Sequence, residues 1–183
     1  MAAASAYGDW LKQEMNGLID TVEVGKLQQQ FLRGRWLEQL LWFDAQAGRN
    51  RFWHYRLRLA TIIAGALVPA LISLSPACAS NWEALYKVVT VTLSLIVAIF
   101  SSLEGFFQFG ERWRHYRRSA EGLKITGWQF FQLSGPFANY ASHAEAYPIF
   151  VAHVEEAIQR DVESYVTQVA NDKQKPAQGT KSA

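Results

Sequence analysis

The feature that most limits how this chain can fold is a pair of long apolar stretches joined by a short segment. The first runs from Leu59 to Trp82 without a charged side chain. The second begins at Val88 and carries only Glu104 before Glu111. As helices rising about 1.5 Å per residue, both are long enough to cross a hydrocarbon core of about 30 Å. The sequence therefore predicts an all-α integral membrane protein built on a hairpin of two transmembrane helices.

A soluble bundle with both apolar helices in its core is the alternative. The chain has 183 residues, which leaves room for one domain. Two long helices that are apolar on every side could not both be wrapped by the rest of so short a chain. Pro69 lies inside the first stretch, and membrane helices tolerate proline because their neighbours re-satisfy the freed carbonyl. The membrane hairpin is therefore favoured.

The domain boundaries follow from the apolar stretches and from the composition around them. The first 20 residues are mixed in character, so we expect a flexible segment, although Trp10, Leu11, Met15 and Leu18 could form a short amphipathic helix. A break is predicted at Ser134-Gly135-Pro136. The expected segments are 1–20 flexible, 21–58 cytoplasmic helix, 59–80 transmembrane helix, 81–86 external loop, 87–110 transmembrane helix, 111–170 cytoplasmic helical region with a last helix over 142–169, and 171–183 disordered tail.

Basic residues precede the first apolar stretch and follow the second. The segment that connects the two stretches has only one basic residue, Lys87. Lysine and arginine collect on the cytoplasmic side of membrane proteins. We therefore expect a multi-pass protein of the cell membrane, with two spans and both termini in the cytoplasm. The flanking basic residues are Arg49, Arg51, Arg56 and Arg58 before the first stretch, and Arg112, Arg114, Arg117, Arg118 and Lys124 after the second.

A polar stripe follows the second span. Its members recur at alternating spacings of four and three, which places them on one face of a helix. Polar groups in a bilayer turn toward protein or a water-filled cavity, because hydrocarbon offers them no partners. The stripe is predicted to line a pore or, with equal weight, to form a helix–helix contact. It consists of Thr90, Ser94, Val97, Ser101, Glu104, Gln108 and Glu111.

Glu104 is the most informative member of the stripe, because a carboxylate that faces lipid is costly. It lies about 24 Å along the helix from Val88, near the cytoplasmic end of the span. In a ring of subunits, Glu104 and Glu111 would form acidic rings of the kind that cation pathways use. The alternative is a pair between Glu104 and an arginine beside the membrane.

The first span carries a different stripe, in which small or kinked positions recur every four residues. Small residues at this spacing let two helices approach closely. We interpret the stripe as a packing face against the second span or a neighbouring subunit. It consists of Thr61, Gly65, Pro69 and Ser73.

The basic segment after the second span is interleaved with aromatic residues. Such a segment can hold anionic lipid head groups, or it can simply fix the topology. The arginines assigned to lipid head groups are Arg112, Arg114, Arg117 and Arg118.

Several classes of function are disfavoured. A net charge of +2 does not suggest nucleic-acid binding. The single cysteine, Cys78, gives no disulfide and no cysteine-based metal site. The chain shows no phosphate-binding loop, no HExxH motif and no nucleophile elbow, and its four histidines are dispersed. We therefore expect no enzyme activity, cofactor or metal.

An ordered set of segments around both spans resembles a known family. The segments are Arg35-Trp36-Leu37, IIAGALVPAL over residues 62–71, LEGFF over 103–107, ERWRHYR over 111–117 and AEGLK over 120–124. Their order and spacing, over about residues 25–135, are similar to those of the bacterial DUF4231 family, part of the SLATT group of two-transmembrane effector domains. The resemblance implies a two-span helical protein that oligomerises into a membrane pore.

Two hypotheses for the function follow. The first is an oligomeric channel or pore, cation-conducting, with the second span lining the pathway and with membrane lipids, permeant cations and further copies of the chain as partners. The second is a non-conducting scaffold that anchors a partner through its cytoplasmic helices.

Overall fold

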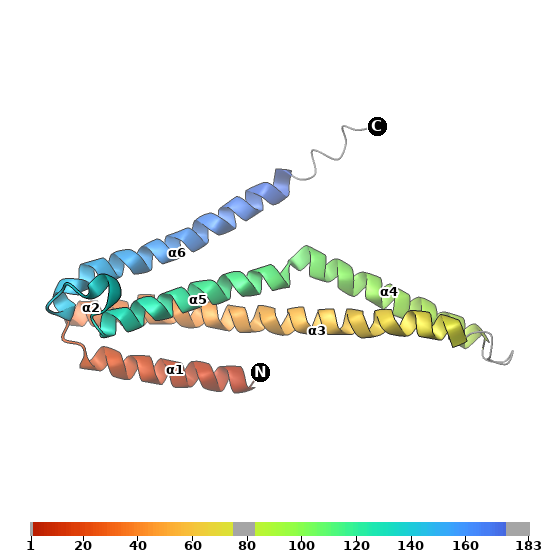
Figure 1. The fold of residues 1–183 in the computed structure, drawn as a ribbon, viewed down its shortest axis with the longest axis horizontal. Coiled ribbons are helices and arrows are strands. Elements are labelled where there is room, and N and C mark those ends of the chain that lie inside the picture. Colours follow the sequence, from red (N-terminus) through yellow and green to blue (C-terminus); the bar gives the residue numbers. More distant parts are fainter. Residues whose placement is uncertain (1, 75–82, 175–183) are drawn as a thin grey trace. The chain divides into compact units, whose positions relative to one another are not determined.

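The computed structural model describes residues 2–74 and 83–174, and throughout these ranges the chain forms helices and turns without a strand. The expected all-α fold is therefore confirmed (Figure 1). The elements are α1 (Ala2–Thr21), α2 (Lys26–Phe31), the π-helix η1 (Leu32–Leu37), α3 (Glu38–Leu74), α4 (Glu83–Phe107), α5 (Phe109–Phe131), the 3-10 turn η4 (Gly135–Phe137) and α6 (His143–Gln174).

The chain divides into two compact units. The first, here called the bundle, comprises Met1–Ala45 and Tyr116–Ala183. The second, here called the hairpin, comprises Gln46–His115. Each unit contains part of α3 and part of α5, because both helices continue across the boundaries.

An aromatic cluster forms the centre of the bundle core. Trp36 is fully buried, and its ring meets Phe131 and Phe150 edge-on at 5.6 and 6.0 Å between centroids. Its Nε1 donates a hydrogen bond to the Leu123 carbonyl at 3.1 Å. A Cβ at Gly127 of α5 would lie 2.1 Å from Trp36 Cζ2, so only glycine lets α5 approach this closely. Trp36 thus joins three helices through one side chain.

The N-terminal segment differs from the expectation of a flexible region. Residues Ala2–Thr21 form α1, and Leu11, Met15 and Ile19 are buried in the bundle core. Of the four residues of the amphipathic alternative, Leu11 and Met15 are buried and Leu18 is half-buried, but Trp10 is 55% exposed; Ile19 completes the buried face at spacing four. Lys12 adds an ion pair to Glu38 at 2.7 Å. Burial of this face supplies the tertiary packing from which helices in proteins gain most of their stability.

The first long helix begins later than expected, since Gly25 is extended and caps α2. Gly25 donates its N–H to Gln28 Oε1 at 2.9 Å. The helix then continues through η1 into α3, which ends at Leu74, so no helix boundary separates the expected cytoplasmic and transmembrane segments. Of the predicted first span, 75–80 lie outside the described residues, as do 81–82 of the loop; residues 83–86 begin α4.

A break at Gln108 separates α4 from α5, which begins at Phe109. This residue adopts a left-handed backbone with φ of 49°. Its N–H donates to the Glu104 carbonyl at 3.0 Å, and its carbonyl accepts from Glu111 and Arg112 at 3.0 and 3.1 Å. The break therefore leaves few backbone groups unpaired.

The C-terminal region follows the prediction closely. The break at Ser134-Gly135-Pro136 is present, and Gly135 has a φ of 57° that suits glycine. The last helix, α6, buries Phe150, Val154 and Ile158 against the bundle. Of the expected tail, 171–174 belong to α6 and 175–183 lie outside the described residues.

Candidate functional site: the hairpin and its polar residues

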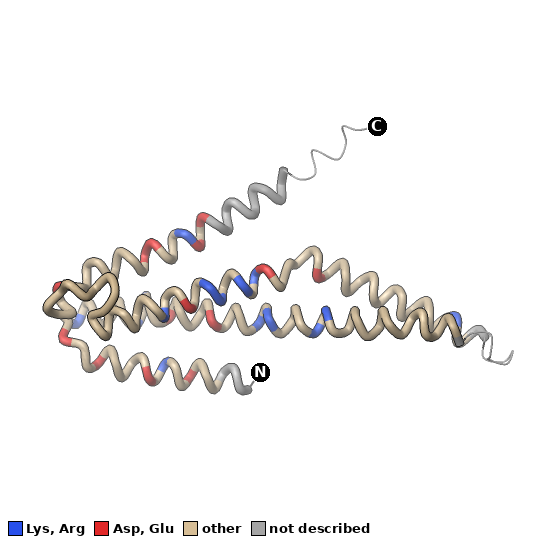
Figure 2. Tube along the Cα trace, in the orientation of Figure 1, with Lys and Arg blue, Asp and Glu red and all other residues tan. Residues whose placement is uncertain are grey.

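The hairpin exposes most of its apolar surface. Two helical stretches are long and apolar enough to cross a membrane by length and composition, one in α3 and one in α4. The described chain buries about a tenth of the first apolar window and none of the second. Figure 2 shows how few charged residues interrupt this part of α3 and α4. The chain thus does not wrap these helices, whereas a soluble bundle would bury them.

One face of each helix is nevertheless covered. On α3, Leu57 and Ala64 are buried. Thr61, which lies between them, and Val68, one turn after Ala64, are half-buried. Residues of α4 at matching spacings of three and four are also half-buried: Thr90, Leu93, Val97, Phe100 and Glu104. Since the hairpin contains no other long helix among its described residues, these two rows cover one another. This spacing is that of left-handed helix pairs.

The polar stripe of α4 is therefore divided between two faces. Thr90, Val97 and Glu104 lie seven residues apart in the row that faces α3. The remaining members, Ser94, Ser101, Gln108 and Glu111, are exposed in the single chain. Sequence periodicity placed all seven on one side, but a paired helix covers only half of that side.

Several hydroxyl groups of the hairpin bond to their own helix. Thr90 Oγ1 donates to the Tyr86 carbonyl at 3.0 Å, and Ser94 Oγ to the Thr90 carbonyl at 2.9 Å. Thr61 and Ser73 of α3 bond to carbonyls four residues earlier, both at 2.9 Å. Such bonds let serine and threonine lie in apolar surroundings. These hydroxyls alone do not require a wet environment.

His54 and Glu104 meet beside the break at Gln108. His54 Nδ1 lies 3.1 Å from Glu104 Oε1, with the two side chains 15% and 28% exposed. The distance suits an ion pair, but the atoms are not aligned for a hydrogen bond. The sequence suggested an arginine as the partner of Glu104. No local pattern could have indicated His54, because the two residues are 50 positions apart.

The small-residue stripe of the first span is mostly uncovered. Thr61 is half-buried against α4, whereas Gly65, Pro69 and Ser73 are exposed. Nothing lies within 4 Å of the position that a Cβ would occupy at Gly65. The second span, α4, was one of the two expected packing partners of this stripe, and it covers only Thr61. A neighbouring subunit as the partner of the rest stays a prediction.

The arginines assigned to lipid head groups do not behave alike. Arg112, Arg114 and Arg118 are exposed. Arg117 instead pairs with Asp44 at 2.9 Å and with Glu121 at 2.7 Å. It thereby stabilises the bundle.

A buried lysine completes this network. Lys124 is only 9% exposed at its side chain and lies 3.4 Å from both Asp44 and Glu121. Its Nζ is also 5.4 Å from the centre of the Tyr7 ring. Burial acts to lower the pKa of Lys124, but Asp44, Glu121 and Tyr7 outweigh it and raise the pKa. The network therefore ties α1, α3 and α5 together.

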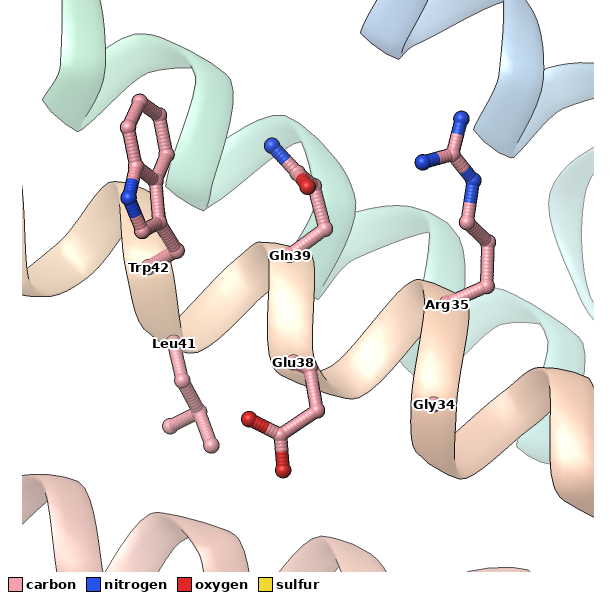
Figure 3. Close-up of a pocket in the computed structure, with 6 residues that line it drawn as sticks. All are labelled: Gly34, Arg35, Glu38, Gln39, Leu41 and Trp42. Carbon is pink, nitrogen blue, oxygen red and sulfur yellow. The ribbon is translucent and has the colours of Figure 1, made fainter.

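An open groove lies along η1 and the start of α3 in the bundle. It encloses about 480 Å³ and is lined by Gly34, Arg35, Glu38, Gln39, Leu41 and Trp42. Figure 3 shows that Arg35, Gln39 and Trp42 extend to one side of the helix, and Glu38 and Leu41 to the other. Arg35 donates two hydrogen bonds to Glu155, both 2.9 Å. The lining groups thus do not converge on a ligand.

The fold and the hairpin define an all-helical protein with two helices that could span a membrane. The sequence profile of a family described as "Protein of unknown function (DUF4231)" matches residues 38–145. The chain belongs to this family. Searches of curated proteins and of solved structures found no significant match.

Proposed function

We propose that this protein is an oligomeric channel or pore of the cell membrane that conducts cations along a path lined by α4. In this arrangement α3 and α4 cross the bilayer, and both termini lie in the cytoplasm because the basic residues flank that side of both spans. The proposal includes no catalytic step and no cofactor.

The observation that carries the proposal is the row of polar side chains that the hairpin leaves exposed on α4. Ser94, Ser101 and Gln108 recur every seven residues on a surface that is mostly apolar. Gln108 is the strongest member, because an exposed amide in hydrocarbon would lack partners for both its donors and its acceptor. Assembly of several hairpins with this row inward would place these groups around a common axis.

Glu104 and Glu111 have different parts in this arrangement. Glu104 contacts His54 within one chain. It therefore lies on the side of α4 that faces α3, next to the exposed row and not in it. Glu111 is exposed in the first turn of α5. Repeated around an axis, Glu111 would attract cations to the cytoplasmic mouth.

The small-residue face of α3 supports assembly. Gly65 and Pro69 leave a surface on which another helix can approach closely. Pro69 also leaves the Gly65 carbonyl without its usual helical donor. The neighbouring subunit is the partner that we propose for this face, with Arg112, Arg114 and Arg118 contacting anionic lipid head groups beside it.

Thiol accessibility in liposomes tests which face of α4 is wet. In a Cys78→Ser background, cysteines at Ser94 and Ser101 are compared with matched cysteines at Val91 and Ile99, which are 68% and 47% exposed in the single chain. A membrane-impermeant charged thiol reagent should modify the serine positions faster than the apolar positions. Cation flux through the same liposomes should fall when the serine positions are modified.

Two outcomes would count against the pore. Equal protection of all four positions, together with no flux, would make the stripe a dry contact and favour the scaffold hypothesis. Faster reaction at Val91 and Ile99 would place the aqueous path on the other side of α4.

A further inference from the structure

We propose that one face of α3, at the start of its apolar stretch, binds an anionic phospholipid through Arg51 and Arg58. The site rests on the part of the proposed function in which α3 crosses the bilayer, but it requires neither an oligomer nor conduction. It is also separate from the α5 arginines assigned above to lipid head groups. Failure of this site would therefore leave the proposed pore in place.

The arginines of the two units differ in their partners. In the bundle, four of the five arginines form ion pairs with carboxylates: Arg33, Arg35, Arg117 and Arg160. In the hairpin, all six arginines are exposed, and no ion pair joins any of them to a carboxylate of the described residues: Arg49, Arg51, Arg56, Arg58, Arg112 and Arg114. The hairpin thus presents guanidinium groups that remain available to an anion from outside the chain.

The segment of α3 that carries four of these arginines contains no carboxylate. No aspartate or glutamate occurs between Asp44 and Glu83. The charge-free stretch begins at Leu59, directly after Arg58. Arg58 therefore lies at the boundary where lipid head groups meet hydrocarbon, and lipid phosphate is the anion present at that depth.

Two of these arginines share a face of α3 with an aromatic ring. The members of this face, here called the basic flank, are exposed and recur at spacings of four, three and four: Arg51, Tyr55, Arg58 and Ile62. The Tyr55 ring meets Trp113 of α5 edge-on, with 6.3 Å between centroids, so α5 borders the flank. Beyond Arg58 the flank is apolar, since Ile62 is 60% exposed. Charge followed by apolar surface is also the order of the parts of a phospholipid.

The two arginines have different parts in binding. Side chains of a helix lean toward its N-terminus, so Arg58 extends from the apolar boundary toward the head groups. Its planar guanidinium can donate two parallel hydrogen bonds to a phosphate. Arg51 lies two turns nearer the cytoplasm, where it adds a second positive charge on the water side of that phosphate.

Arg51 also makes the site selective for a head group without a cation. In phosphatidylcholine, the ammonium group lies on the water side of the phosphate, where it would meet Arg51. The Tyr55 ring, which could otherwise bind choline, already lies beneath Arg51, with 5.9 Å from the guanidinium carbon to the ring centre. Phosphatidylglycerol has no cation in its head group, so it avoids this repulsion.

Native mass spectrometry of the full-length protein in detergent tests this selectivity. The protein is titrated with phosphatidylglycerol or with phosphatidylcholine of the same acyl chains, and the affinity for the first lipid bound is compared. The unmodified chain should bind phosphatidylglycerol about ten- to thirtyfold more tightly, as expected for two arginines near a lipid surface. Arg51→Gln with Arg58→Gln should abolish this preference. Circular dichroism should show unchanged helix content, because neither arginine has an ion pair to lose.

The matched control removes the same charge from another face of α3. Arg49→Gln with Arg56→Gln shifts each substitution by two residues, which is about 3 Å along the helix and about 160° around it. Arg56 is held by its own helix, over the Phe52 ring and 4.5 Å from its centre. This variant should keep the preference for phosphatidylglycerol. Equal losses in the two double variants would overturn the site, as would an unmodified chain that binds both lipids equally well.

A second pair of variants leaves every charge in place. Tyr55→Leu removes the ring beneath Arg51 and should lower the preference about two- to fivefold. Trp53, two residues earlier and 46% exposed, should be replaceable by leucine without this loss. Equal preference in the two variants would overturn the assignment of the basic flank.

A competition experiment separates a lipid from a soluble anion. Inorganic phosphate at the concentration of the lipid should not displace phosphatidylglycerol, because it offers no acyl chains to the apolar part of the flank. Displacement at equal concentration would overturn the lipid as the occupant.

Discussion

Replacement of Gly127 by alanine should destabilise the bundle, although alanine is the better helix former. The added Cβ would lie 2.1 Å from Trp36 Cζ2, 2.8 Å from Cη2 and 3.0 Å from Cε2. Carbon atoms in contact ordinarily stay about 3.5 Å apart, so the ring would have to move by about 1.4 Å. Trp36 is fully buried between Phe131 and Phe150, which leaves little room for that movement.

Three contributions set the size of the effect. Forcing extra volume into a packed core costs about 1–3 kcal/mol. Displacing the ring also breaks the bond from Trp36 Nε1 to the Leu123 carbonyl and leaves buried polar groups unpaired, which costs about 1–3 kcal/mol. The higher helix propensity of alanine offsets about 1 kcal/mol of this loss of stability. The free energy of unfolding should therefore fall by about 1–5 kcal/mol.

Urea unfolding of the full-length protein in detergent micelles, followed by tryptophan fluorescence, measures this loss. With a slope of about 2 kcal/mol per molar urea, the midpoint should fall by about 0.5–2.5 M. Gly122→Ala is the matched control on the same helix, because its added methyl group meets nothing within 4 Å. Its midpoint should stay the same or rise, since alanine favours helix by up to about 1 kcal/mol.

A double substitution tests the proposed cause. In a Trp36→Leu background the clash is absent, so Gly127→Ala should cost little or nothing further. The reasoning would be refuted if Gly127→Ala were as stable as Gly122→Ala. It would also be refuted if the cost of Gly127→Ala were unchanged in the Trp36→Leu background.

Three further perturbations have defined outcomes. Gln108→Gly should raise the free energy of unfolding by about 1 kcal/mol, because glycine accepts left-handed backbone; Gln108→Ala, unchanged in the same urea titration, is its control. Asp44→Ala should lower the urea midpoint by an amount equivalent to about 2 kcal/mol, since Lys124 stays buried without one of its two carboxylate partners; an unchanged midpoint would contradict this pairing. The hydrogen bonds from Arg35 lower the pKa of Glu155, so their contribution is present above the unfolded pKa and is lost as pH falls through the folded pKa. Because Glu155 is 43% exposed, Glu155→Gln should cost only a few tenths of a kcal/mol at neutral pH, and the difference from the unmodified chain should vanish in acid.

The local sequence determined the secondary structure of most of the chain. The helices expected over 142–169 and 21–58 correspond to α6 and the long first helix, and Ser134-Gly135-Pro136 predicted the turn before η4. The charge-free stretches predicted two helices that could span a membrane. These features depend on a residue and its near neighbours, so they can be derived without the fold.

In the hairpin, the local sequence could not predict which residues of the α4 stripe are covered. The stripe lies on a helix, α4, but which of its members are covered depends on how α3 packs against α4. Thr90, Val97 and Glu104 turned toward α3, while Ser94 and Ser101 did not. Periodicity shows which residues share a face of a helix, but not what that face contacts. The sequence alone therefore could not decide whether the polar stripe forms a helix–helix contact or lines a pore.

The tertiary structure alone decided three features. It placed α1 in the bundle core, because a weak amphipathic helix becomes stable only when Leu11, Met15 and Ile19 have a surface to cover. It broke the helix at Gln108 against the local preference for a continuous helix. It also brought His54 to Glu104 across 50 positions of sequence. The apolar stretches and helices were encoded locally, whereas these features arise from contacts between residues far apart in the chain, and those contacts form only when the helices pack.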